Sequence, residues 1–211
     1  MAINIMCFGD SNTYGYNPEG GRFERRYPRE LAKILGDKYY VVEEGLGGRA
    51  ASCEDGLFAD LCGHNRIAML VRSHSPLDLL VINLGTNDYK ERMSLSPRDI
   101  AIGVLQCVRR AREACFTDGF PTPKILLVAP APINKGIYNC EFGESFGGER
   151  GIQKSIETPQ WIKQTAEENN CYFLNAGDYV SSSFVDGIHL EEKDHIALAK
   201  ALAEKIQEIF K

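Results

Sequence analysis

Several features of secreted, membrane-bound and metal-binding proteins are missing from this 211-residue sequence. Its longest apolar run, residues 77–85, is far shorter than the roughly eighteen residues that a membrane-spanning helix needs. The N-terminal residues lack the basic segment and the long apolar stretch of a signal peptide. The seven cysteines form no Cys-x-x-Cys pair and are odd in number, which is typical of reduced thiols rather than of a disulfide framework. We therefore expect a cytoplasmic protein without membrane contacts.

The sequence also has no excess of basic residues. The net charge of −5 argues against a nucleic-acid partner, because such a partner requires a basic face. No Gly-x-x-x-x-Gly-Lys-Ser/Thr motif is present, so no nucleoside triphosphate site is predicted. Residues 45–50, "GLGGRA", match a loose dinucleotide fingerprint, but they follow the second predicted strand rather than the first. His64 and His74 have no cysteine at metal-ligand spacing. We therefore expect neither a metal nor a cofactor.

Short apolar runs alternate with helix-like segments along the whole chain. Runs rich in β-branched or aromatic residues predict strands at 3–8, 39–44, 77–84, 124–130 and 171–177. Capping signals or helical apolar spacing predict helices at 26–35, 96–115 and 191–210. This alternation predicts a single α/β domain spanning residues 1–211, a three-layer α/β/α sandwich around a five-stranded parallel sheet. Right-handed crossovers favour the flavodoxin-like strand order 2-1-3-4-5.

Polar residues and glycines follow the predicted strands. The residues at these strand ends are Ser11, Gly47, Gly48, Asn87, Asp186 and His189. Because ligands of such sheets bind outside the carboxyl ends of the strands, we expect these residues to meet at one edge. A serine, a histidine with a carboxylate partner, and amide donors are the groups that a serine acyl hydrolase requires.

Each of these residues has a chemical role in acyl transfer. His189 can take the proton of a nucleophilic Ser11, and Asp186 can hold the other ring nitrogen of the histidine. The Ser11 N–H, the Gly48 N–H and the Asn87 amide can stabilise the oxyanion of the tetrahedral intermediate. Structural alternatives exist: a serine can cap a helix, a glycine can supply a positive φ, and an asparagine can stabilise a turn.

Four blocks of sequence carry a resemblance to a known family. "FGDSNTYG", "EEGLGGRA", "LGTNDYK" and "VDGIHL" resemble, in order and separation, the blocks of the SGNH (GDSL-type) hydrolases. The stretches "VVEEGL", "PLDLLVINLGTNDYK" and "AGDYVSSSFVDGIHL" further resemble the arylesterases and acyltransferases within that family. The resemblance implies a triad of Ser11, Asp186 and His189, without metal or cofactor, and is compatible with a homo-oligomer.

Two departures from the family pattern affect the expected site. Asn12 replaces the leucine that commonly follows the nucleophile, and we expect it to alter the floor of the substrate pocket. The asparagine that often opens the second block is replaced by Glu43 and Glu44. A shift of one residue in that block would make Gly47 the oxyanion donor in place of Gly48.

These residues predict a serine esterase that hydrolyses small acetyl or aryl esters through an acyl-enzyme. Transfer of the acyl group to an alcohol would follow if the pocket excludes water. A carbohydrate acetylesterase uses the same residues and stays open as an alternative. A second alternative is a binding module that retains the motifs and binds a small ester or glycan without turnover.

A second serine motif, Gly143-x-Ser145-x-Gly147, matches the nucleophile elbow of α/β-hydrolases. Asp178 or Asp186 and then His189 follow it in the appropriate chain order. However, an elbow needs a strand before the serine and a helix after it, and neither flank has that composition. We therefore expect Ser145 to be inactive.

The segment that contains this motif, residues 131–151, is rich in glycine and is predicted to be a long loop. Long loops in small domains often cover functional sites. We expect this loop to cover the active site, and we expect Phe142, Phe146 and Trp161 to shape the substrate pocket.

Overall fold

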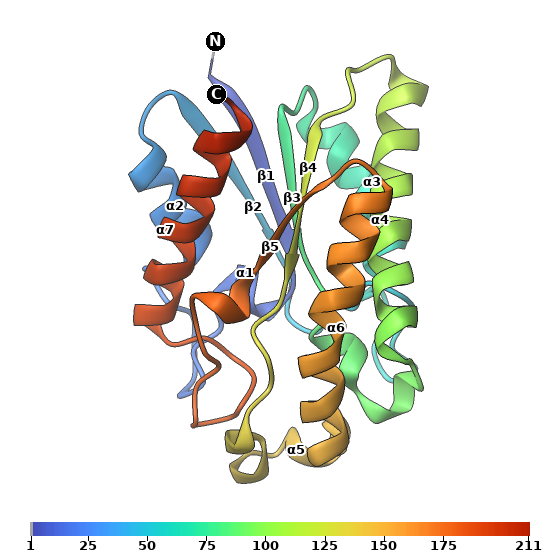
Figure 1. The fold of residues 1–211 in the computed structure, drawn as a ribbon, viewed down its shortest axis with the longest axis vertical. Coiled ribbons are helices and arrows are strands. Elements are labelled where there is room, and N and C mark those ends of the chain that lie inside the picture. The colour runs from blue at the N-terminus through green and yellow to red at the C-terminus, as the bar shows by residue number, and fades with distance from the viewer. Residues whose placement is uncertain (1) are drawn as a thin grey trace.

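A five-stranded parallel sheet forms the centre of the protein in a computed structural model that describes residues 2–211 (Figure 1). Its strands are β1 (Ile3–Gly9), β2 (Tyr39–Gly45), β3 (Leu79–Asn83), β4 (Lys124–Ala129) and β5 (Tyr172–Asn175). They lie in the order β2-β1-β3-β4-β5, and every neighbouring pair is parallel. The predicted strand order is confirmed.

Helices cover both faces of this sheet (Figure 1). One face carries α2 (Tyr27–Leu35) and α7 (Glu192–Ile209), and the other carries α3 (Gly63–His74), α4 (Pro97–Asp118) and α6 (Glu149–Glu168). The predicted three-layer sandwich is therefore confirmed. Within residues 2–211, no helix has the length and hydrophobicity needed to cross a membrane.

Local sequence signals explain where these helices begin. Pro28 lies in the first turn of α2, where its missing N–H leaves no hydrogen bond unmade. Ser96 and Asp99 form a capping box at the start of α4, with each side chain bonded to the backbone N–H of the other residue. The sequence signals therefore predict the starts of both helices correctly.

Two hydrophobic cores hold the layers together, one on each face of the sheet. Successive strand residues point to opposite faces, so Met6 and Phe8 enter one core while Ile5 and Cys7 enter the other. Burial raises the pKa of the Cys7 thiol, which therefore behaves as a small apolar group. The sheet is thus a rigid platform, and its carboxyl edge is available for a functional site.

The segment predicted as a long glycine-rich loop, residues 131–151, contains two short helical turns and the start of α6. These turns are η3 (Lys135–Asn139) and α5 (Gly143–Phe146). Ile137 and Phe146 are buried in a small third hydrophobic cluster that includes Ile188. This burial orders the segment and joins it to the chain next to His189.

Candidate active site

The nucleophile candidate lies in a tight turn at the carboxyl end of β1. Ser11 is the first residue of α1 (Ser11–Tyr14), a helix of one turn. Asp10 caps this helix, because its Oδ1 accepts the Asn12 N–H at 2.9 Å. A Cβ on Gly9 would collide with the side chain of Thr13, so the turn requires a glycine there. The turn places Ser11 at the edge of the sheet.

Ser11, His189 and Asp186 form a continuous chain of hydrogen bonds. The Ser11 Oγ lies 2.8 Å from His189 Nε2, and His189 Nδ1 lies 2.6 Å from Asp186 Oδ2. The other carboxylate oxygen, Asp186 Oδ1, accepts the N–H groups of Ile188 and His189, each at 2.9 Å. The three residues predicted from sequence are therefore brought together in the arrangement of a catalytic triad.

The surroundings of Asp186 keep its carboxylate ionised. Burial opposes the negative charge, but the hydrogen bonds from the His189 ring and from the backbone outweigh it and hold the pKa of Asp186 below its usual range. An ionised Asp186 accepts a hydrogen bond from His189 Nδ1. His189 Nε2 is then free to take the proton of Ser11.

The side chain of Asn12 braces the loop that carries His189. Its Oδ1 accepts the Leu190 N–H at 2.9 Å, and its Nδ2 donates to the Ile188 carbonyl at 3.4 Å. Both ends of the amide thus bind the backbone on either side of the histidine. The structure places Asn12 beneath the loop rather than in the pocket wall, so a direct substrate contact through Asn12 stays a prediction.

Ser11, Gly48 and Asn87, which line one pocket, each carry a hydrogen-bond donor suited to an oxyanion. The Ser11 N–H lies in the first turn of a helix, where intrahelical acceptors are missing. The Gly48 N–H donates to no backbone acceptor in the described chain, residues 2–211. Asn87 Nδ2 donates to the Arg49 carbonyl at 3.1 Å, which leaves its second hydrogen available. These are the donors that an oxyanion hole requires.

The two candidate glycines of the second block differ in conformation. Gly48 has a φ of +82°, which an L-residue with a side chain rarely adopts, and a Cβ there would lie 2.9 Å from Leu61 Cδ1. Gly47 has open space around it. The positive φ alone explains the glycine at position 48. Both residues line the pocket, and the choice of Gly48 over Gly47 as oxyanion donor stays a prediction.

A pocket of about 170 Å³ opens at Ser11. Besides Ser11, Gly48, Asn87 and His189, its walls are formed by Tyr16, Gly47, Lys90, Phe142, Phe146 and Ile188. The rings of Tyr16 and Phe142 lie 4.4 and 6.4 Å, centroid to centroid, from the His189 ring. The predicted pocket residues Phe142 and Phe146 are therefore at the site.

Trp161 lies elsewhere, and its predicted place in the pocket was wrong. Because α6 begins at Glu149, twelve residues of helix carry Trp161 about 18 Å along the helix axis from that end. Its ring packs against the hydrophobic core beneath α6, and the Arg98 guanidinium carbon lies 5.7 Å from the ring centroid.

Ser145 does not lie on a nucleophile elbow. The preceding strand, β4, ends at Ala129, and Ser145 lies within the short helix α5. Its Oγ donates to the carbonyl of Phe142 at 2.8 Å. This position in a helix, with the hydroxyl bonded to a backbone carbonyl, agrees with the expectation that Ser145 is inactive.

Three residues at the pocket were missed from sequence: Tyr16, Lys90 and Ile188, the neighbour of His189 in the chain. Lys90 stands three residues after Asn87 in the block "LGTNDYK", so extending the interpretation of that strand end by three residues would have found it. Tyr16 lies five residues after the nucleophile, beyond the helical turn that follows β1. Its contact with the His189 ring depends on the return of the chain after β5.

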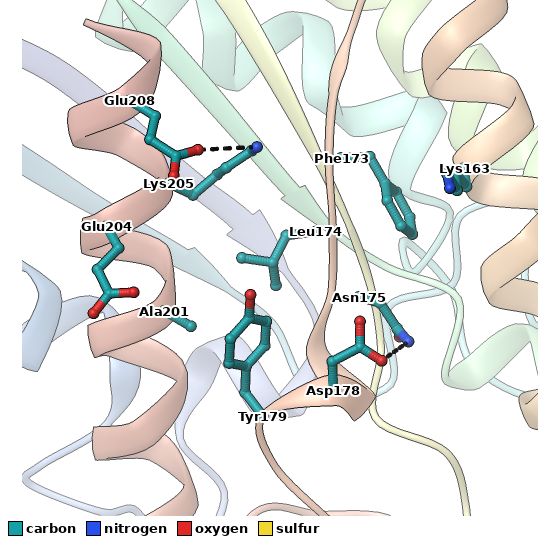
Figure 2. Close-up of a pocket in the computed structure, with 10 residues that line it drawn as sticks. All are labelled: Lys163, Phe173, Leu174, Asn175, Asp178, Tyr179, Ala201, Glu204, Lys205 and Glu208. Carbon is teal, nitrogen blue, oxygen red and sulfur yellow. Dashed lines mark hydrogen bonds and ion pairs between the residues drawn. The ribbon is translucent and has the colours of Figure 1, made fainter. Parts of the chain in front are cut away.

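A second cavity, of about 330 Å³, lies at the outer edge of the sheet, beside β5 and between α6 and α7 (Figure 2). Asp178, the other carboxylate that precedes His189 in the chain, lies here and accepts a hydrogen bond from Asn175 Nδ2 at 2.8 Å. The walls carry lysines, carboxylates and aromatic rings rather than serine or histidine. Asp186, and not Asp178, is therefore the partner of His189.

Comparisons with known proteins agree with this geometry. Residues 7–195 match the GDSL-like Lipase/Acylhydrolase family. A carbohydrate acetylesterase from Sinorhizobium meliloti is 37% identical, with a TM-score of 0.92 over 98% of this chain and 99% of that one. The aryl esterase of M. smegmatis is 35% identical, with the same TM-score and the same coverage of both chains.

A curated acetylxylan esterase from Xylanibacter ruminicola is 29% identical over 98% of this chain. The match covers 43% of that protein, so the present chain spans less than half of its length. The match over residues 7–195 includes all three residues of the hydrogen-bonded chain described above. The sequence and the fold together show that this chain belongs to the GDSL-like lipase/acylhydrolase (SGNH) family.

Proposed function

We propose that this protein is a serine esterase that hydrolyses small acyl esters through an acyl-enzyme on Ser11. The observation that carries the proposal is the chain of hydrogen bonds from Asp186 through His189 to the Ser11 hydroxyl, at 2.6 and 2.8 Å. With the Gly48 N–H and the free hydrogen of the Asn87 amide in the same pocket, this arrangement has the groups needed for both acylation and deacylation.

The reaction proceeds in two halves. Ser11 Oγ attacks the ester carbonyl while His189 Nε2 takes its proton, and the resulting oxyanion is stabilised by the Ser11 N–H, the Gly48 N–H and the Asn87 amide. The intermediate collapses as His189 protonates the leaving alcohol. A water molecule, activated by His189, then attacks the acyl-enzyme and releases the acid.

The pocket favours a small acyl group. Its volume of about 170 Å³ is below the usual range for drug-sized ligands, and aromatic rings form much of its wall. Both similar structures carry names of acetyl- or aryl-ester hydrolases, which supports small acetyl or aryl esters as substrates here. Acetylated carbohydrate is the second candidate, supported by the names of the relatives from S. meliloti and X. ruminicola.

Residues 1–211 act in this proposal as one hydrolase domain, with the segment 131–151 as the cover of the site. Phe142 and Phe146 from that segment limit the entry of water, so an alcohol that enters the pocket could accept the acyl group instead. A cytoplasmic location, the lack of a nucleic-acid partner and a homo-oligomeric state stay predictions from the sequence.

A fluorophosphonate probe tests this proposal directly, because such probes label serines that a neighbouring base activates. We expect one adduct, located on Ser11 by peptide mass spectrometry, and we expect it to be lost in the His189→Ala variant. Ser145→Ala is the matched control and should be labelled as the wild type is. An adduct on Ser145, or no adduct on the folded wild type, would contradict the proposal.

Phe142 is expected to set the acyl chain length that the pocket accepts. Phe142→Ala should raise kcat/KM for a butyrate ester relative to the acetate of the same alcohol by about tenfold, because a methylene in an apolar pocket is worth roughly 1–3 kcal/mol. Phe116, an exposed phenylalanine on α4, supplies the control variant Phe116→Ala. An unchanged ratio in Phe142→Ala would show that Phe142 does not limit the acyl group.

A further inference from the structure

Lys90 is a basic residue among those that line the pocket at Ser11. It directly follows η1 (Asn87–Tyr89), the short helix that begins with the oxyanion candidate Asn87. The residue is only 9% exposed, and it lines the same pocket as Ser11. The triad and the oxyanion donors make no use of this ammonium group.

The carboxylate nearest to Lys90 is already occupied by another cation. Lys90 Nζ lies 3.4 Å from Asp55 Oδ2. Both Asp55 oxygens accept shorter hydrogen bonds from Arg92, from Nε at 2.9 Å and from Nη2 at 2.6 Å. The Leu57 N–H adds a further donor at 3.0 Å. Lys90 is thus the weaker partner of Asp55, and the group of two cations and one carboxylate carries a net charge of +1.

Burial makes this charge costly in the free protein. Burial, together with the nearby Arg92 charge, lowers the pKa of Lys90, and the attraction of Asp55 opposes that shift only in part. The hydrogen bonds from Arg92 lower the pKa of Asp55 to about 2. A buried ammonium with unused donors gains free energy from any oxygen acceptor that enters the pocket.

We propose that Lys90 determines specificity by binding an oxygen acceptor of the substrate next to the scissile ester. This inference rests on the proposed esterase function and names the substrate class more narrowly. Lys90 favours esters that carry a carboxylate most strongly, because a hydrogen bond between two charged groups is stronger than a neutral one. It favours esters that carry a hydroxyl group to a smaller extent, and alkyl esters least.

The test compares three small acetates that share one acyl group: propyl acetate, 2-hydroxyethyl acetate and acetoxyacetate. Acid release in a pH-stat gives kcat/KM for each. We expect the wild type to prefer acetoxyacetate over propyl acetate, and we expect Lys90→Met to reduce that ratio by about 10- to 100-fold. The effect on 2-hydroxyethyl acetate should be smaller, and Lys90→Arg should restore part of the preference. The same comparison with methyl butyrate, methyl 3-hydroxypropionate and monomethyl malonate tests for an acceptor in the acyl group.

Arg92→Gln examines the same charge without changing Lys90. With Arg92 removed, Asp55 would pair with Lys90 alone, so the preference for acetoxyacetate should fall although the lysine is still present. Lys163→Met, a change at an exposed lysine of α6, is the control and should leave the ratio at its wild-type value.

Two results would overturn the inference while leaving the esterase proposal intact. One is a wild type that cleaves the esters of both series through Ser11 without preference for the oxygen-bearing members. The other is a folded Lys90→Met variant, verified by circular dichroism, that loses activity equally on the three members of each series. Absence of Ser11-dependent cleavage of every ester would instead overturn the proposed function, and this inference with it.

Discussion

Ser11→Ala is expected to lower kcat for the hydrolysis of phenyl acetate by at least about 10⁴-fold, because His189 then has no hydroxyl to activate. The amide donors of Gly48 and Asn87 remain and account for the residual rate. The measurement is the initial rate over a range of substrate concentrations, so that kcat and KM are obtained separately. The KM should change little, because the pocket walls are untouched.

Ser145→Ala is the matched control for this loss, since it removes a hydroxyl from the only other candidate nucleophile motif in the sequence. The Ser145 hydroxyl donates to the carbonyl of Phe142, whereas His189 Nε2 is hydrogen-bonded to Ser11. Most of the activity should therefore remain. A loss in Ser145→Ala together with full activity in Ser11→Ala would reverse the assignment of the nucleophile.

Asp186→Asn is expected to lower kcat by about 10⁴-fold while the fold is retained. Asparagine keeps an oxygen that can accept the N–H groups of Ile188 and His189, so the loop geometry survives. Its amide nitrogen would donate to His189 Nδ1, which moves the ring proton to Nε2. In that tautomer the histidine no longer takes the proton of Ser11. Steady-state kinetics with phenyl acetate measure the loss.

Asp178→Asn is the control, because Asp178 is also a carboxylate that precedes His189 in the chain but lies in the distant cavity of Figure 2. It should retain wild-type kinetics. Equal losses in the two variants would show that neither effect reports on the triad.

Asp186→Asn should also change how the stability of the fold depends on pH. The pKa of Asp186 is lower in the folded protein than in the unfolded chain, so its ionisation stabilises the fold above pH ~4 and this contribution is lost as the pH falls below that value. Thermal unfolding across the acid range should therefore show a shallower decline in Asp186→Asn than in the wild type.

The sequence by itself determined the layers, the strand order and the three residues that meet in the hydrogen-bonded chain of Ser11, His189 and Asp186. Continuous apolar runs such as that of β3 are buried on both faces of a parallel sheet, and parallel strands bring their carboxyl ends to a single edge. Ser11, Asn87 and His189 each follow a strand or the loop after one. Their proximity therefore follows from topology and needs no knowledge of side-chain packing.

Only the tertiary structure decided which other residues join the site. Trp161 is aromatic and near a glycine-rich segment, yet the start of α6 at Glu149 carries it away along the helix. The position of Lys90 after Asn87 places it near the edge of the sheet, but no sequence signal indicates that its side chain is buried. Its burial and its competition with Arg92 for Asp55, a residue 35 to 37 positions earlier in the chain, arise only when those segments meet. Charge and burial depend on such long-range contacts, and for this reason local sequence patterns predicted the hydrogen-bonded chain from Asp186 to Ser11 but not the place of Lys90 in the pocket wall.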